Sequence, residues 1–360
     1  MAQIDAFFKL MNEQGASDLH MVSGQQPILR INGDMERVKY KELENDTLKA
    51  MLYEIVSEDK TKRFEETGDV DFGYEIPGLA RYRGNLFQQK YGIGSVFREI
   101  PSDILTCDQL QLPSIVKKLA SLPKGMILVT GPTGSGKSTT LAAIVDEANK
   151  TRADHILTIE DPIEFVHKSQ KAIVNHREVG LHTESFSNAL RGALREDPDI
   201  ILVGEMRDLE TIALAMEAAM TGHLVFGTLH TLNAAKTVDR IIEIFPTSQQ
   251  AQVRSTLADA LKAVVSQTLF KRIDVKGRCA ALEILICTPA VRNLIREAKT
   301  YQIPSAMQTG KKFGMQTLDD AILEHLQDNR ISAEDAYTNC IEKGKFVQFL
   351  KKPPSDFTDI

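Results

Sequence analysis

The sequence GPTGSGKST at residues 131–139 decides the fold, because it has the form G-x-x-x-x-G-K-[ST] of a phosphate-binding loop. It follows the apolar residues 126–129, typical of a buried strand, and precedes residues 139–145, typical of a helix. Such a loop points backbone N–H groups at phosphates, and the helix N-terminus adds partial positive charge. The sequence therefore predicts a nucleoside-triphosphate site rather than a glycine turn that binds nothing.

The loop residues have separate expected contacts. Lys137 would reach the β- and γ-phosphates of ATP, and the Ser138 hydroxyl would ligate Mg²⁺. The expected nucleotide-binding residues are Gly131, Pro132, Thr133, Gly134, Ser135, Gly136, Lys137, Ser138 and Thr139.

Length, charge and cysteine spacing exclude several classes of protein. A chain of 360 residues predicts about two domains, and a net charge of −6 argues against a protein dedicated to holding nucleic acid. The four cysteines form no C-x-x-C pair, so neither a zinc ribbon nor a disulfide framework is expected. The first residues lack a basic region and no stretch has eighteen consecutive apolar residues. We therefore expect a cytoplasmic protein without direct membrane insertion.

Residues 1–100 have the pattern of an α+β domain, in which helices and antiparallel strands are segregated. The expected elements are a helix in 1–12, strands and hairpins in 15–35, helices in 42–66 and strands in 69–98. Asn32-Gly33 is a hairpin signal, and prolines at both ends indicate a linker over 101–113.

From residue 114 onward, apolar strands alternate with helices, which predicts a largely parallel sheet and an α/β domain over 114–360. The expected strands are 126–130, 155–160, 199–204, 223–229 and, more weakly, 280–287. The expected helices are 137–150, 185–196, 207–220, a long amphipathic helix at 248–272 and a mostly helical extension from 289. Ser185 and Asp208 stand at expected N-cap positions.

Two further strands end in carboxylates. In LTIEDPIEF, residues 157–165, an apolar strand ends at Glu160 and Glu164 follows a proline turn, although the residues alone leave open a charged loop without a ligand. In PDIILVGEMRD, residues 198–208, Gly204 occupies the position of the usual Walker-B acid and Glu205 follows it. Glu205 would orient or deprotonate the attacking water, with Mg²⁺ held by Ser138, phosphates and waters. The alternative is a surface glutamate that caps the next helix.

A third stretch, TGHLVFGTLHTLNA at residues 221–234, places His223 at the start of a strand and His230 beyond its end. The spacing leaves open whether these histidines sense the γ-phosphate or are structural. No zinc ligand set surrounds them.

GPTGSGKST, IEDPIE, VGEMRD and TGH…TLHT, in this order, resemble the motifs of the type II secretion / type IV pilus ATPase superfamily. GASDLH at 15–20, leading into PILRINGDM, is similar to the start of that superfamily's N-terminal domain. AVRNLIRE at 290–297 and GMQTLD at 314–319 resemble its retraction branch, the PilT-like ATPases. The longer N-terminal region and four-cysteine zinc insertion of the extension branch are not present.

The resemblance implies a homohexameric ring. Each chain would have a smaller α+β, PAS-like N-terminal domain (1–100), a linker (101–113) and a RecA-like P-loop ATPase domain with a helical C-terminal extension (114–360). ATP hydrolysis would drive type IV pilus retraction in twitching motility. The motion would pass to an inner-membrane platform protein, which would hold the ring peripherally at the inner membrane.

The resemblance also assigns roles to individual residues. Glu160 and Glu164 would order the catalytic water and the Mg²⁺ shell, and Thr221 and His230 would contact the adjacent protomer. Arginines of the first domain would stabilise charge on the γ-phosphate. Gly84, where the family pattern suggests a larger residue, leaves open which arginine does so. The expected catalytic residues are Glu205, Glu160, Glu164, Arg81, Arg83, Thr221, His230 and His223.

Other functions remain open. Within the superfamily, the chain could be an accessory retraction ATPase or an extension or secretion ATPase. A RecA-like nucleic-acid motor is disfavoured by the acidic charge balance, and a non-hydrolysing regulatory subunit is disfavoured by intact Lys137, Ser138 and Glu205.

Overall fold

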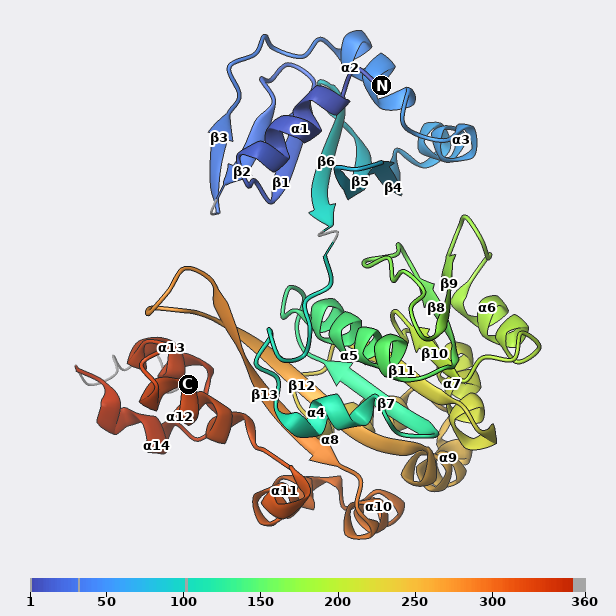
Figure 1. The fold of residues 1–360 in the computed structure, drawn as a ribbon, viewed down its shortest axis with the longest axis vertical. Helices are drawn as coiled ribbons and strands as arrows, with labels where there is room; N and C mark the ends of the chain where they lie inside the picture. The colour runs from blue at the N-terminus through green and yellow to red at the C-terminus, as the bar shows by residue number, and fades with distance from the viewer. Residues whose placement is uncertain (1, 32, 101–102, 352–360) are drawn as a thin grey trace. The chain divides into compact units, whose positions relative to one another are not determined.

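The computed structural model describes residues 2–31, 33–100 and 103–351. The chain divides into two compact units (Figure 1). Unit 1 comprises Met1–Ile104 and the short segment Pro162–Val166, and unit 2 comprises Leu105–Asp161 and His167–Ile360.

Unit 1 is an antiparallel sheet with helices. Among the described residues the strand order is β3-β2-β1-β6-β5-β4. The helices are α1 (Asp5–Glu13), α2 (Asn45–Tyr53) and α3 (Glu58–Thr67), and the strands are β1 (Asp18–Val22), β2 (Ile28–Ile31), β3 (Asp34–Arg37), β4 (Asp69–Ile76), β5 (Ala80–Gln89) and β6 (Gly92–Ile100). Phe8 of α1 stacks on Tyr82 and meets Phe97 edge-on, so aromatic packing joins the first helix to the sheet. The predicted α+β pattern of this region is confirmed.

Strand β5 carries the two predicted arginines on one face of the sheet. Burial alternates along the strand, with Tyr82 in the core and Arg81 and Arg83 on the opposite face. Gly84 lies on the buried face, where an added Cβ would come within 2.7 Å of the Phe72 ring. The glycine that departs from the family pattern is therefore required by aromatic packing.

Unit 2 is a sheet that is parallel apart from one edge strand. Its order among the described residues is β13-β12-β7-β11-β10-β8-β9, and β13 pairs antiparallel with β12. The strands are β7 (Gly125–Thr130), β8 (His155–Glu160), β9 (Ile173–Glu178), β10 (Ile200–Val203), β11 (Leu224–Leu229), β12 (Leu261–Lys271) and β13 (Arg278–Ile286). Strand β7 is buried throughout, as its apolar sequence predicts.

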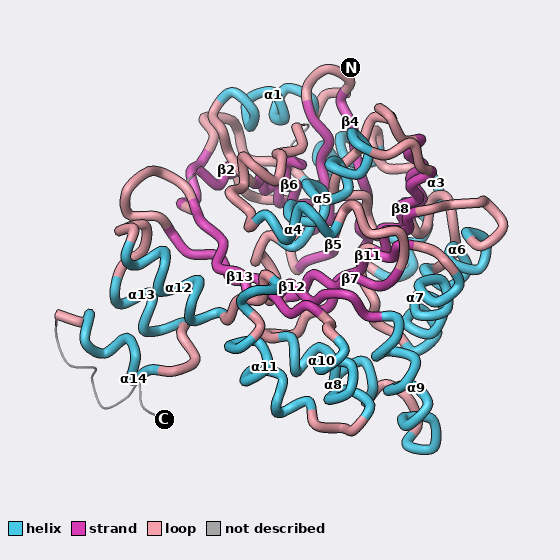
Figure 2. The backbone as a smooth tube through the Cα atoms, turned by 60° about the horizontal axis from the view of Figure 1, so that its bottom comes forward, coloured by secondary structure: helices cyan, strands magenta, loops and turns pink. Residues whose placement is uncertain are grey.

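Helices cover both faces of this sheet (Figure 2). Core residues of α4 and α5 pack on one face, and those of α6 to α11 pack on the other. The helices are α4 (Ser114–Leu119), α5 (Lys137–Thr151), α6 (Phe186–Ala193), α7 (Leu209–Thr221), α8 (Ala234–Glu243), α9 (Thr247–Ala260), α10 (Pro289–Arg296), α11 (Ile303–Thr309), α12 (Leu318–Gln327), α13 (Ala333–Asn339) and α14 (Lys343–Phe346). Within the described ranges, no helix has the length and apolar character needed to cross a membrane.

The predicted long helix at 248–272 is wrong. Helix α9 ends at Ala260, and the chain continues directly as strand β12. The apolar positions Leu261, Val265 and Leu269 are four residues apart, a spacing that suits one helix face but also one strand face. Both faces of β12 are covered, because Val264 belongs to one hydrophobic core and Val265 to the other, so the alternation of buried and exposed residues is lost.

The other predicted elements differ less from the structure. The prediction of helices in residues 42–66 is confirmed. A break before Glu58 divides the region into α2 and α3. The predicted N-caps are confirmed, since Ser185 and Asp208 accept hydrogen bonds from the N–H groups of Asn188 and Thr211. Strand β9 and helices α4 and α8 were not predicted. Asn32 of the expected hairpin turn and the C-terminal residues 352–360 lie outside the described residues.

Candidate nucleotide-binding site

The loop between β7 and α5 has a backbone that only glycine adopts easily. Gly131, Gly134 and Gly136 have φ angles of 143°, 78° and 85°, in the left-handed region. A Cβ at Gly131 would also lie 2.4 Å from the backbone oxygen of Gln267. The glycines of the motif therefore satisfy both a backbone requirement and a close approach to strand β12.

The polar side chains of the loop suit a phosphate ligand. The Lys137 ammonium donates to the carbonyls of Gly131 and Pro132 at 2.9 and 3.1 Å, which curls the side chain over the loop. Burial lowers the pKa of Lys137, and the carboxylate of Glu205 opposes this shift. The buried Ser135 hydroxyl has no hydrogen-bond partner among the described residues. An anion in the loop would add charge compensation for Lys137 and an acceptor for Ser135.

The remaining loop residues are accessible to a ligand. Pro132, Thr133 and Gly134 are exposed at the tip, and Ser138 and Thr139 are half-buried in the first turn of α5. The hydroxyl of Ser138 is a suitable Mg²⁺ ligand, with phosphate oxygens and waters supplying the rest. Among the described residues, no group of three or more His, Cys, Asp or Glu side chains offers a separate metal site.

The carboxyl ends of four parallel strands bring the other motifs to the same edge as the loop. Strands β7, β11, β10 and β8 are successive neighbours in the sheet. They end next to the loop, His230, Gly204-Glu205 and Glu160, respectively. Ligands bind at this edge of open α/β sheets, so the structure groups Lys137, His230, Glu205 and Glu160 where chemistry is expected.

Glu205 is the central acid of this edge. Its Oε2 accepts a hydrogen bond from Arg207 at 2.6 Å, and its Oε1 lies 3.3 Å from Nε2 of His230. Burial alone would raise the pKa of Glu205, but Arg207 and His230 outweigh burial and hold the pKa below its ordinary value. Asp208, rather than Glu205, caps α7. The capping alternative for Glu205 is therefore wrong.

The lack of space around Gly204 explains why a glycine, and not the usual Walker-B acid, follows strand β10. A Cβ at Gly204 would lie 3.2 Å from the Cα of Glu160, so a larger residue would crowd the end of β8. The Gly204 carbonyl accepts a hydrogen bond from the Thr228 hydroxyl of β11 at 2.5 Å. Thr228 thus fixes the backbone that carries Glu205, a contact that sequence reasoning missed because Thr228 read as an ordinary strand residue.

Thr221 and His223 lie at the opposite edge of the sheet. The His223 carbonyl accepts from the N–H of Gly125, the first residue of β7, whereas the phosphate-binding loop follows the last residue. Six strand residues span about 20 Å. The structure therefore does not bring His223 or Thr221 to the loop of its own chain, and γ-phosphate sensing by His223 within one chain is wrong. A contact of Thr221 with a neighbouring protomer stays a prediction.

The remaining predicted site residues lie in unit 1. Arg81 is 4.0 Å from Glu75, and Arg83 is 3.5 Å from Glu164 in the segment Pro162–Val166. Arg83 lies directly across the strand pair from Arg98, so the positively charged side chains form a row on the sheet.

Residues 167–170, where the chain enters unit 2 after Glu164, are held by a buried histidine pair. The ring of His167, 4% exposed, stacks on the His176 ring with centroids 5.9 Å apart, and the His167 N–H donates to Nε2 of His176. Asn149 of α5 accepts from the Gln170 N–H at 3.0 Å. These contacts hold residues 167–170 within unit 2.

We expect acid to destabilise unit 2 through His167. The pKa of His167 is lowered from 6.5 to about 4, chiefly by burial and further by the His176 ring, while Asp146 opposes the shift. Between these values the unfolded chain binds a proton that the folded chain does not, so stability falls as pH falls from 6.5 to 4. The loss approaches about 3 kcal/mol.

Urea unfolding of wild type and His167→Phe at several pH values tests this expectation. The variant should lack this part of the pH dependence. Equal slopes for wild type and His167→Phe would contradict the prediction.

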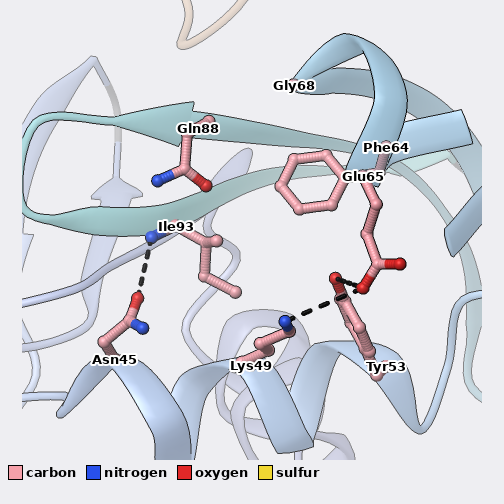
Figure 3. A pocket seen from close by; sticks show the side chains of 8 residues that line it. All are labelled: Asn45, Lys49, Tyr53, Phe64, Glu65, Gly68, Gln88 and Ile93. Carbon is pink, nitrogen blue, oxygen red and sulfur yellow. Dashed lines mark hydrogen bonds and ion pairs between the residues drawn. The ribbon is translucent and has the colours of Figure 1, made fainter. Parts of the chain in front are cut away.

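A separate pocket of about 370 Å³ lies in unit 1 beside α2 and α3 (Figure 3). Its charged groups pair with one another, because Glu65 lies 3.7 Å from the Lys49 ammonium and accepts a hydrogen bond from the Tyr53 hydroxyl at 3.1 Å. No predicted site residue lines this pocket.

The sheet order and the loop geometry define unit 2 as a RecA-like P-loop ATPase domain. Residues 103–336, more than half of the chain, match the family described as Type II/IV secretion system protein. The chain therefore belongs to the Type II/IV secretion system protein family.

Individual relatives resemble the chain over most of its length. It is 56% identical over 324 residues to the type IV pilus retraction ATPase PilT of Pseudomonas aeruginosa, covering 90% of this chain and 94% of that protein. It is 53% identical over 310 residues to a twitching motility protein of Neisseria gonorrhoeae, covering 86% and 83%. The crystal structure of the pilus retraction motor PilT with bound ADP matches with a TM-score of 0.88 at 45% identity, covering 96% of this chain and 98% of that one.

Proposed function

We propose that this protein is an ATPase motor that drives retraction of type IV pili and hence twitching motility. The observation that carries the proposal is the similarity to a pilus retraction ATPase over 90% of the chain. The grouping of Lys137, Glu205 and His230 at one sheet edge supports hydrolysis rather than passive nucleotide binding.

The substrate in this proposal is ATP, which water attacks in line at the γ-phosphorus. Lys137 and the loop N–H groups hold the phosphates, and Glu205 orients the water or accepts its proton. The lowered pKa of Glu205 keeps it ionised at neutral pH, which suits a carboxylate that accepts a hydrogen bond from the attacking water and orients it. Mg²⁺ at the Ser138 hydroxyl would neutralise charge on the phosphate oxygens. Glu160 and Glu164 would help to order the water.

We propose a PAS-like domain at residues 1–100, a linker at 101–113 and the ATPase domain with its helical extension at 114–360. The part of this linker from Leu105 onward packs with unit 2. Six copies would form a ring, in which Arg81 or Arg83 of one copy stabilises charge on the γ-phosphate held by another. The shared sheet face of the two arginines and their fixed planar charge suit that role.

The proposed partner is a platform protein of the pilus machine in the inner membrane. The ring would act from the cytoplasm and associate with the membrane through that partner. Closure around ATP and release after hydrolysis would supply the motion that is passed on.

Deletion of the gene tests the direction of the motor. We expect cells that carry excess surface pili and no longer twitch on agar, with both defects reversed by the wild-type gene. Cells without pili would identify an extension motor, and cells that still retract pili would identify an accessory ATPase. Salt-dependent DNA binding with DNA-stimulated hydrolysis would overturn the proposal in favour of a nucleic-acid motor.

A further inference from the structure

One buried side chain of strand β12 touches the phosphate-binding loop and its helix together. The Nε2 of Gln267 donates to the Ser135 carbonyl at 2.6 Å, and its Oε1 accepts from the Thr140 hydroxyl at 2.7 Å. Ser135 belongs to the loop, and Thr140 lies in the first turn of α5. Gln267 therefore bridges the loop to the helix that follows it.

The first and last glycines of the loop lie against Gln267, with no room for a side chain of their own. A Cβ at Gly131 would lie 2.4 Å from the backbone oxygen of Gln267, and a Cβ at Gly136 would lie 2.8 Å from its Nε2. Gln267 is only 3% exposed. Loss of its amide would leave the Ser135 carbonyl and the Thr140 hydroxyl without this partner, and a buried group without a partner is costly.

The bridge also sets the direction of a neighbouring donor. The peptide unit between Ser135 and Gly136 is planar and trans, so its carbonyl and its N–H point in opposite directions. Because Gln267 draws the carbonyl toward β12, the Gly136 N–H is directed away from β12. An N–H group whose direction is fixed in this way is preorganised as a donor, as the donors of a phosphate-binding loop must be.

We propose that Gln267 is a positioning residue for nucleotide phosphates, which keeps the loop in its binding conformation without contacting the nucleotide. The proposal rests on the proposed function of this site as an ATP site. A preformed loop spares the ordering free energy that a relaxed loop would lose on binding. Gln267 should therefore act on affinity and leave the chemical step largely unchanged.

Titration of the full-length protein with a fluorescent ADP analogue tests the proposal. Gln267→Glu keeps the size and the acceptor for Thr140 but places a carboxylate oxygen against the Ser135 carbonyl. We expect its affinity to fall about tenfold or more, since it loses one buried hydrogen bond and gains a repulsive contact. In ATP hydrolysis, KM should rise while kcat stays within about threefold of wild type. A general loss of stability would not raise KM and spare kcat in this way.

Two further variants keep the test decisive. Ser266→Ala removes the neighbouring buried hydrogen bond to Thr130, at 2.8 Å, and should change affinity by less than about twofold. Thr140→Val removes one end of the bridge at little cost in volume and should weaken binding about threefold, even where Gln267→Glu fails to fold. Wild-type affinity in Thr140→Val or in a folded Gln267→Glu would overturn the proposal. Absence of ADP binding by the wild type would instead refute the proposed function.

Discussion

The variant Glu205→Ala should bind ATP as tightly as the wild type and lose turnover by a factor of about 10² to 10⁴, the usual contribution of a general base. Glu205 is the acid at the end of β10, 3.3 Å from His230, and its pKa is held below the ordinary value. Removing it takes away the group that orients the water but none of the loop that holds the phosphates. Phosphate release at saturating ATP and binding of a fluorescent ATP analogue measure the two effects separately.

Glu210→Ala is the matched control for this variant. Glu210 lies five residues further on, in the first turn of α7, and pairs with Arg191 on the surface. Its loss should leave turnover within about twofold, because exposed ion pairs contribute little. Normal turnover in Glu205→Ala would move the role of the base to Glu160, which lies at the same sheet edge.

The variant Lys137→Ala should weaken ATP binding by about 10- to 100-fold, the loss expected for a charge-assisted hydrogen bond. The Lys137 ammonium is held over the loop by the carbonyls of Gly131 and Pro132, so it lies ready for the phosphates. Burial lowers its pKa, and negatively charged phosphates would restore the preference for the charged form. Calorimetric titration with ATP measures the affinity directly.

Lys150→Ala provides the comparison for Lys137→Ala. Lys150 lies at the other end of the same helix, in its last turn, and pairs with Asp146 at 2.5 Å. Its removal should leave ATP affinity unchanged. Equal affinity in Lys137→Ala and Lys150→Ala would mean that nucleotide binds elsewhere.

The strongest sequence patterns predicted the fold because they are local. Strand β7 is an uninterrupted apolar run, the loop after it has fixed glycine spacing, and Asp208 stands where an N-cap is needed. Each of these signals depends on residues within a few positions of one another. They required no knowledge of which strands become neighbours.

Strand β12 shows where local patterns fail. Its apolar spacing suits a helix as well as a strand, and only pairing with β7 and β13 decides between them. A helix over these residues would not place Gln267 next to the phosphate-binding loop, so the sequence pattern did not indicate a role for it. The contact between Gln267 and Ser135 joins residues 132 positions apart, so no local pattern contains it.

The sequence by itself determined the phosphate-binding loop, the acid after β10 and the two-part α+β and α/β organisation, because each follows from residue order and periodicity. Tertiary structure alone decided which motif residues meet. Parallel pairing of β7, β11 and β10 brings His230 to Glu205 and leaves His223 at the opposite edge, although both histidines flank one strand. The direction of a strand in its sheet decides which of its ends lies at the site, and that direction is set by long-range pairing.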